Sequence, residues 1–386
     1  MLGTLFSGAL KGLLRSSPRR HAPFPSGGFV AFVTNVDSVQ RVNPDCAYDS
    51  GIASTRLRVL IPARELARRV PVWLVPLDTF IADPTLARLG RAGAIIIGKL
   101  PVRSVLQQAD ALRQMISFAR SRGGSVPLYA DLSDDYAAFA RAENAPFLAE
   151  YQEALGGICT LIVTCAALEA ALRTTARRGI LVIEDPYEDP RAQTVRVSAG
   201  APVRFAWFGN LAPLNSPQLE RAFVRVASGL SDMPVEIEVV ADASVRDVVT
   251  ALGGRLRTGH SRLRLSFTPW SLEATRAAID HCDFVLLPQD HASDWARVKS
   301  HNRLVAAIRG GRLALASPIP SYRELAAYAW VDEDLAAGAR WALAHPPEAM
   351  RRVSDGQHYC EERFSPSVIG RRWADALGLN PAAPNG

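Results

Sequence analysis

Two cations lie at the start of a segment whose sequence pattern predicts a helix. Apolar residues recur at helical spacing over residues 302–309, Ser300 stands where an N-cap belongs, and two glycines follow as a stop. Lys299 precedes this helix and Arg303 falls in its first turn. Because cations at a helix start oppose the helix dipole, helix stability does not explain them. A bound anion would explain them, since the free N–H groups of a helix start bind phosphate groups.

The loop before these cations follows a short apolar run. Residues 284–287 are typical of a buried parallel strand, and the loop after them is polar and contains Asp290 and His291. Open α/β sheets bind ligands outside the carboxyl ends of their strands. We therefore expect an anionic ligand where this loop meets the helix start, close to Lys299 and Arg303.

The stretch from residue 283 to residue 325 resembles the donor site of glycosyltransferases built from two Rossmann-like domains, the B-type fold. The likeness is greatest to the large retaining family, family 4-like, that builds bacterial surface polysaccharides. In that family a lysine, the pattern N-[RK]-[LVI]-x-E-A-[LM]-x-x-G, a short apolar strand and a proline-rich turn are typical. The matching residues are Lys299, Asn302, Arg303, Leu304, Ala307, Gly311, the run 313–317, Pro318 and Tyr322.

The resemblance implies transfer of a sugar from a nucleotide-diphosphate-sugar donor to a glycan or lipid-linked acceptor in surface polysaccharide biosynthesis. It implies a hexosyltransferase that retains the anomeric configuration and uses neither a cofactor nor a metal. Lys299 and Arg303 would stabilise the leaving diphosphate electrostatically. The implied donor-binding residues are Gly209, Asn210, Asp290, His291, Ser300 and Asn302.

The chain departs from this family at the glutamate pair E-x7-E. Ala306 stands where the second glutamate belongs, and Val298 stands where the first would fall. Two alternatives therefore stay open. A non-catalytic nucleotide-sugar-binding relic would bind a donor without turnover, whereas a nucleotide-sugar 2-epimerase on the same fold would convert a donor incubated alone into its epimer.

Residues 50–58, SGIASTRLR, resemble a second motif of these transferases, S-x-R-[LIV]-R. Gly51 and Ser54 are small enough to let the backbone approach a ligand, and Arg56 and Arg58 can grip phosphate with two hydrogen bonds each. We expect these residues to contact the acceptor or a phosphate. The alternative is a capped helix start whose arginines are solvated.

The acidic run 129–136, YADLSDDY, resembles a third motif. Carboxylates at strand ends lie on the ligand-binding edge of a parallel sheet, so Asp131, Asp134 and Asp135 can orient acceptor hydroxyls, with Asp131 as the catalytic candidate. The alternative is a group of N-capping residues that opens the next helix. A magnesium site is not expected, because a cage made only of carboxylates is unusual.

Alternating strand and helix patterns position these residues. They predict parallel βαβ units and an α/β protein of two Rossmann-like domains that face each other across a cleft. No G-x-G-x-x-G motif follows the first strand, so a nicotinamide site lacks support. The predicted strands are residues 29–34, 70–77, 94–98, 126–130, 161–165, 180–183, 203–208, 235–240, 263–267, 284–287 and 313–316.

The proline-rich stretch 184–202 separates the two series of strands and predicts the domain boundary. The expected parts are an N-terminal amphipathic extension (1–28), an acceptor domain (29–185), a linker (186–202), a donor domain (203–363) and a C-terminal helical segment (364–386). The resemblance implies that this last segment returns to the first domain.

Composition agrees with a two-domain protein that binds anions. The chain has 386 residues, a net charge of +6 and five scattered cysteines without a C-x-x-C motif. This length exceeds one ordinary core, and the cysteine pattern indicates reduced thiols in a cytoplasmic protein. No zinc-finger spacing or basic recognition helix occurs, so we expect no nucleic-acid partner. The motifs H-E-x-x-H and G-x-S-x-G are absent as well, which argues against zinc proteases and serine hydrolases.

Residues 1–20 combine apolar residues at helical spacing with four basic residues: Lys11, Arg15, Arg19 and Arg20. An amphipathic helix of this kind can lie on an anionic membrane surface. Peripheral contact with the inner face of the membrane is therefore one expectation. The alternative is an extension that packs on its own protein.

Overall fold

The computed structural model describes residues 28–46, 50–76, 92–98, 126–143, 146–194, 202–210 and 216–379. The predicted amphipathic segment 1–20 lies outside these ranges. The chain divides into two compact units. Unit 1 comprises Met1–Pro186, Val298–Ser300 and Phe364–Gly386, and unit 2 comprises Tyr187–Arg297 and His301–Arg363.

Unit 1 contains a seven-stranded sheet in the order β2-β3-β1-β4-β5-β6-β7. Every pair of neighbours is parallel except β2 with β3, which is antiparallel. The central strands are apolar along their whole length and are covered on both faces, as parallel strands require. The strands are β1 (Val30–Thr34), β2 (Gln40–Arg41), β3 (Val72–Pro76), β4 (Ala94–Ile97), β5 (Leu128–Leu132), β6 (Thr160–Val163) and β7 (Ile180–Val182).

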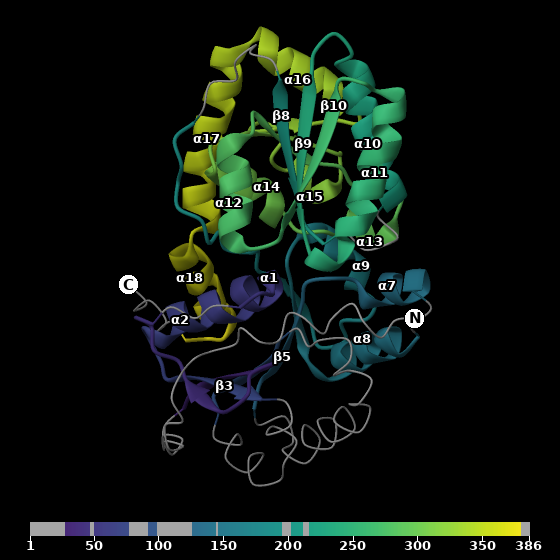
Figure 1. Cartoon of the computed structure of the whole chain (residues 1–386). Helices are drawn as coiled ribbons and strands as arrows, with labels where there is room; N and C mark the ends of the chain where they lie inside the picture. The colour runs from purple at the N-terminus through teal and green to yellow at the C-terminus, as the bar shows by residue number, and fades with distance from the viewer. Residues whose placement is uncertain are drawn as a thin grey trace. The chain divides into compact units, whose positions relative to one another are not determined.

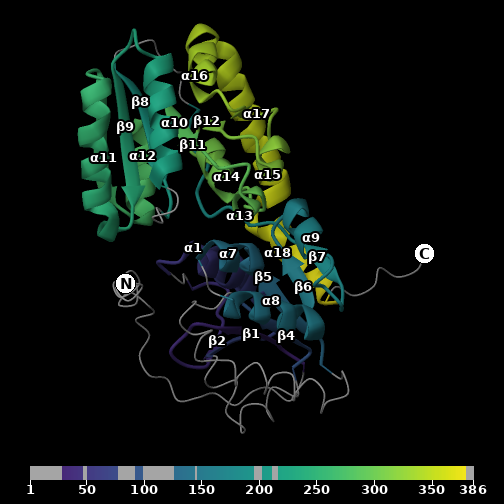
Figure 2. The ribbon, with the colours of Figure 1, turned by 90° about the vertical axis from the view of Figure 1, so that its right-hand side faces the viewer.

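Two layers of helices cover this sheet. One face packs against a continuous helical stretch, α1-η1-α2, and against α18, which lies beside α2. The other face packs against α7, α8 and α9, and α9 lies beside β6 and β7 (Figure 2). The bounds are α1 (Ala53–Thr55), the π-helical turn η1 (Arg56–Leu60), α2 (Ile61–Ala67), α7 (Tyr136–Glu143), α8 (Phe147–Ile158), α9 (Ala166–Leu172) and α18 (Pro366–Ala376).

Unit 2 contains a six-stranded, wholly parallel sheet in the order β10-β9-β8-β11-β12-β13. Helices α10 and α11 lie on one side of β8, β9 and β10, and α12 lies on the other (Figure 1). The strands are β8 (Val203–Phe208), β9 (Val235–Ala241), β10 (Leu263–Pro269), β11 (Phe284–Leu287), β12 (Leu313–Ala316) and β13 (Trp330–Val331). The helices are α10 (Ser216–Gly229), η3 (Ala243–Val245), α11 (Arg246–Gly259), α12 (Leu272–His281), α13 (Asp294–Arg297), α14 (Asn302–Arg309), α15 (Pro320–Arg323), α16 (Leu335–Ala344) and α17 (Pro346–Phe364).

Side-chain caps explain where several of these helices begin. Ser271 accepts a hydrogen bond from the Ala274 N–H at the start of α12, and Asp334 does the same for α16. Ser365 accepts from Val368 at the start of α18, where Pro366 occupies the first helical position. Each cap satisfies an N–H group that has no partner within its own helix.

The direction of chain progression reverses at β8. The chain moves outward from β8 to β9 and β10, and then crosses back to place β11 on the opposite side of β8. This reversal is the switch point of an open α/β sheet, where ligands bind outside the carboxyl ends of the strands. A ligand site is therefore expected at the residues that follow β8 and β11.

The prediction of an α/β fold with two Rossmann-like parts is confirmed. Strands β8, β11 and β12 have the predicted bounds, and the other predicted strands differ at their ends. Helix α7 was expected only in the capping alternative for the acidic run, and neither α8 nor the short strands β2 and β13 were predicted. The strand expected at 161–165 ends early because Cys165 is already the N-cap residue of α9.

Candidate functional site

The N-cap residue of α14 lies one position later in the chain than predicted. His301 is the N-cap residue and makes no side-chain capping bond. Ser300 instead donates its hydroxyl hydrogen to Asp185 Oδ2, at 2.6 Å. The prediction that Ser300 caps this helix is therefore wrong, because its hydroxyl is engaged by a carboxylate of unit 1. The first N–H groups of α14 have no side-chain cap.

Arg303 and Gly209 come together at the switch point of unit 2. The Arg303 Nη1 group donates to the Phe208 carbonyl oxygen at 3.3 Å, at the carboxyl end of β8. Gly209 has φ +152°, and a Cβ atom added there would lie 2.9 Å from Arg303 Nη1. The positive φ favours glycine, and an added Cβ atom would also displace the end of the Arg303 side chain. The result is a guanidinium held against a side-chain-free stretch of backbone.

Four other donor-binding candidates, Asn210, Asp290, His291 and Asn302, also belong to unit 2. Asn210 is exposed after Gly209, and Asn302 is half-buried in the first turn of α14. Asp290 accepts a hydrogen bond from the Ala292 N–H within its own turn, at 3.1 Å. His291 Nε2 lies 3.2 Å from Glu333 Oε1, and both side chains are largely exposed.

Lys299 contacts the acidic run of unit 1. Its ammonium group lies 2.5 Å from Asp134 Oδ1, and both side chains are mostly buried. The sequence predictions assigned Lys299 to the donor and Asp134 to the acceptor, but the structure joins the two in one ion pair. The main chain beside Lys299 is also held, because the Cys165 thiol donates to the Val298 carbonyl oxygen at 3.4 Å.

Arg58 and Asp131 form a buried ion pair. Arg58 Nη2 lies 2.5 Å from Asp131 Oδ1, and Nη1 donates to the Ile183 carbonyl at 2.7 Å and to Asp185 Oδ1 at 3.3 Å. Burial by itself lowers the pKa of Arg58, but the charges and hydrogen bonds of Asp131 and Asp185 outweigh it and raise that pKa. Both side chains are fully buried and satisfy each other. In the structure, the two side chains expected to contact a phosphate and the acceptor are therefore bonded to each other in the core of unit 1.

The third aspartate of the run is a helix cap. Asp135 Oδ1 accepts from the N–H groups of Ala137 and Ala138 at 3.0 and 3.1 Å, and from Gln152 Nε2 at 3.1 Å. The capping alternative thus holds for Asp135. Next to it, burial and then the charges of Asp134 and Asp131 raise the pKa of Tyr136.

The SGIASTRLR stretch opens the helix α1-η1-α2. Gly51 is exposed and Ser54 is half-buried near the helix start, whereas Arg56 is buried and donates to the Ser50 carbonyl. A buried guanidinium that bonds the backbone does not fit the expected grip on a phosphate. The π-helical turn begins at this residue and carries Arg58 into the core.

Sequence reasoning missed Asp185 and Cys165 as members of this arrangement. Asp185 was given no site role at the end of the expected acceptor domain, yet its two oxygens bind Arg58 and Ser300. The available signal was an acidic residue two positions after a predicted parallel strand, similar to the signal that drew attention to Asp131. Cys165 carried no signal, because a lone buried thiol reads as a core residue.

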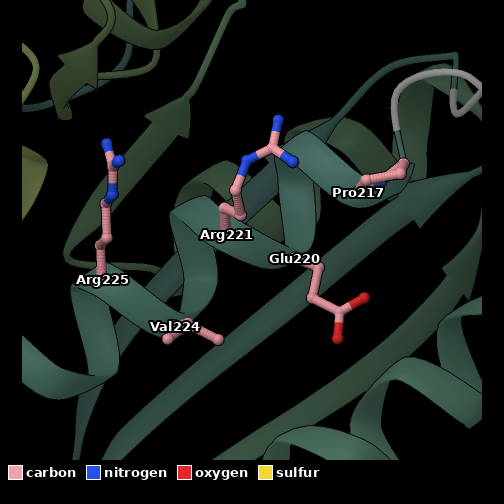
Figure 3. Close-up of a pocket in the computed structure, with 5 residues that line it drawn as sticks. All are labelled: Pro217, Glu220, Arg221, Val224 and Arg225. Carbon is pink, nitrogen blue, oxygen red and sulfur yellow. The ribbon is translucent and has the colours of Figure 1, made fainter.

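A hollow of about 460 Å³ lies along α10 and is a poor candidate for the site. Its lining comes from this one helix: Pro217, Glu220, Arg221, Val224 and Arg225. Figure 3 shows the two arginines pointing away from Glu220. None of the predicted site residues belongs to it.

Among the residues that the structure describes, no three His, Cys, Asp or Glu side chains form a group that could hold a metal ion. None of the described helices combines the length and the apolar character needed to cross a bilayer.

Solved structures of similar fold decide the architecture. Alr3699/HepE from Anabaena, in complex with UDP-glucose, has 15% identity and a TM-score of 0.60, and the match covers 91% of this chain and 100% of that one. The chain has the B-type glycosyltransferase fold. The UDP-forming α,α-trehalose-phosphate synthase of Burkholderia vietnamiensis gives a TM-score of 0.60 at 10% identity, over 92% of this chain and 99% of that one.

An E. coli structure described as trehalose-6-phosphate bound with UDP-2-fluoro glucose shares the B-type fold at 10% identity, with a TM-score of 0.58 over 95% of this chain and 98% of that one. No protein-family model matches the sequence, and a search of curated proteins finds no match. Within its B-type fold, this chain holds Gly209 and Arg303 in unit 2, and Asp134, Asp185 and Lys299 in unit 1.

Proposed function

We propose that the protein is a glycosyltransferase that moves a sugar from a nucleotide-diphosphate-sugar donor to a glycan or lipid-linked acceptor, with retention at the anomeric carbon. Surface polysaccharide biosynthesis is the proposed setting, in the cytoplasm, with residues 1–20 in contact with the membrane surface. Structures of the same fold contain UDP-glucose and UDP-2-fluoro glucose, which makes uridine diphosphate the first donor nucleotide to test.

The observation that carries this proposal is the placement of Arg303 against Gly209. A guanidinium, an uncapped helix start and a glycine backbone meet at the switch point of unit 2. A diphosphate needs these three features: positive charge, free N–H groups and room for close approach. The positive charge is most useful when the sugar–phosphate bond breaks and the leaving diphosphate gains charge.

Lys299 is the second cation in this proposal. It is bonded to Asp134 in the structure, so donor binding exchanges one carboxylate partner for a diphosphate of higher charge. In this proposal, Asp134, once released, accepts a hydrogen bond from the acceptor hydroxyl. Asp131 and Asp135 are not assigned to catalysis, because one neutralises Arg58 and the other caps α7.

Arg303→Ala tests the proposal directly. Wild-type protein should show a higher melting temperature with UDP, because a ligand that binds only the folded state stabilises it. We expect Arg303→Ala to lose most of this shift and to lower transfer from UDP-sugars by about 100-fold, with little change in its own melting temperature. Arg221→Ala, which removes an exposed arginine of α10, is the matched control and should behave as wild type. Equal UDP binding by wild type and Arg303→Ala would place the diphosphate elsewhere.

A non-catalytic nucleotide-sugar-binding role is the second candidate, and one observation favours it. Val298, which stands where the resembling family has a glutamate, is buried in a core cluster of unit 1. At the position of the family's glutamate, this chain therefore has an apolar side chain that packs into the core, and no carboxylate. UDP-sugar binding without transfer or donor hydrolysis across a panel of acceptors would select this candidate.

A further inference from the structure

The three residues Val298–Ser300 belong to unit 1, although the chain on either side of them belongs to unit 2. Lys299 is the middle residue, and both of its neighbours are fixed. The Val298 side chain is buried in the core cluster, and its carbonyl oxygen accepts from the Cys165 thiol. Ser300 donates to Asp185 at 2.6 Å. The main chain at Lys299 therefore has an anchor on each side.

The anchor at Ser300 continues into the core through a carboxylate with two partners. Asp185 uses Oδ2 for Ser300 and Oδ1 for Arg58, so its plane is set by both bonds. Arg58 is itself fixed by Asp131 and by the Ile183 carbonyl. Its guanidinium also lies 5.7 Å from the centre of the Trp373 ring. Ser300 thus donates to Asp185, a carboxylate that cannot turn without breaking its buried ion pair with Arg58.

The local helix geometry supports a role beyond packing. Arg58 reaches this position from a π-helical turn, Arg56–Leu60, whose five residues are all buried. Single π-helical turns are rare and occur often at functional sites. Here the turn brings the Arg58 guanidinium to Asp185, which in turn accepts a hydrogen bond from Ser300, the neighbour of Lys299 in the chain. A fold that needed only a filled core could have used an apolar residue there.

We propose that Arg58, Asp185 and Ser300 are positioning residues for Lys299. They fix the main chain beside Lys299, so that only its side chain must reorient when the ammonium group leaves Asp134 for the donor diphosphate. This inference rests on the proposed function and explains how Lys299, one of its two cations, is kept in position. A positioned group loses less conformational freedom when it engages the reacting atoms, and an error of about 1 Å can cost about 100-fold in rate.

A double-mutant cycle between Ser300 and Lys299 tests this. We expect Ser300→Ala to lower kcat for sugar transfer by about 10- to 100-fold and to weaken UDP binding as well. Ser300→Thr, which keeps the hydroxyl, should restore most of the activity. In a Lys299→Ala background, Ser300→Ala should have no further effect, because the group that it positions is gone. Ser271→Ala removes a comparable hydroxyl bond at the start of α12 and should leave kcat unchanged.

The outcomes separate this inference from the function on which it rests. The positioning role would be overturned if Ser300→Ala kept the wild-type kcat, or if the losses of the two single variants multiplied in the double variant. In either case, sugar transfer by the wild-type protein would still support the proposed function. If wild type binds UDP without turnover, the same cycle is measured on UDP affinity, with the same expected loss of additivity. A wild-type protein that neither transfers sugar nor binds UDP would refute the proposed function and this inference with it.

Discussion

Arg58 neutralises two carboxylates that the fold has removed from water. Replacing it by Met leaves Asp131 and Asp185 buried without a cation, and removing one partner of a buried pair typically costs about 3–5 kcal/mol. We therefore expect Arg58→Met to lower the free energy of unfolding by about that amount, measured by urea denaturation at pH 7. Arg351→Met, which breaks an exposed pair with Asp355, is the control and should cost less than about 1 kcal/mol. Equal losses in the two variants would contradict this account.

At this scale the sequence revealed which residues carry chemistry but not which of them meet. Lys299, Asp134, Arg58 and Asp131 were all singled out by type and position. Their pairing depends on strand order, since β5, β6 and β7 must follow one another in the sheet before Asp131 and Asp185 can share one arginine. No local pattern encodes that neighbourhood. Gly209 was identified from its place after a strand, but its contact with Arg303 requires the reversal at β8.

Among the elements, Glu324 links the ends of three helices. It follows α15, lies 3.2 Å from Nε2 of His301 at the start of α14, and lies 3.3 Å from Nη2 of Arg363 near the end of α17. The hydrogen bond from His301, and then the charges of His301 and Arg363, hold the pKa of Glu324 below its ordinary value of 4.5. A lowered carboxyl pKa contributes stability above its ordinary value and loses that contribution as the pH falls through the folded-state value.

Glu324→Gln should therefore flatten the acid limb of the stability profile. Wild-type protein should lose stability on acidification below about pH 4.5, and the variant should lose less over the same interval. Glu361 also has a lowered pKa, through Arg309, so it contributes to the acid limb in both proteins. The measurement is the difference between the two unfolding curves at pH 7 and at pH 3.5. Parallel pH profiles would show that Glu324 is not responsible.

Element prediction succeeded where periodicity and stop signals agreed. Residues 284–287 and 302–309 form β11 and α14 as expected, because an apolar run or a helical stripe ends there at a proline or a glycine pair. Helix α8 was missed because its inner face is not uniformly apolar. Gln152 is buried in α8, where it bonds Asp135 and the Tyr136 N–H, so the stripe is interrupted by a polar residue with a tertiary partner.

Across the whole molecule, the five cysteines should differ sharply in reactivity. All five are free thiols, and only Cys46 is exposed. Burial raises the pKa of Cys159, Cys282 and Cys360 to about 12, so these groups stay protonated at pH 8. Because the thiolate is the reactive form, iodoacetamide should modify one cysteine per native chain and five after unfolding. Cys46→Ser is the control and should abolish native labelling; rapid labelling that persists in it would contradict the buried assignments.

The two-part plan of the molecule was readable from the restart of strand and helix patterns after residue 202. The membership of Val298–Ser300 in unit 1 was not, because three residues carry no periodicity and their flanks continue the pattern of unit 2. The contacts of this tripeptide with Asp134, Cys165 and Asp185 show that it belongs to unit 1. Such crossings are set by the assembled core rather than by local preference.

The crossing at Val298–Ser300 has a practical meaning for recombining proteins of this architecture. A chimaera that exchanges residues 187–363 as one cassette also replaces three residues that the recipient's own core must accept. The incoming side chains would face Asp134, Cys165 and Asp185 without having been selected to match them. A graft in two pieces, residues 187–297 and 301–363, retains the recipient's tripeptide and leaves the interior of unit 1 as it was.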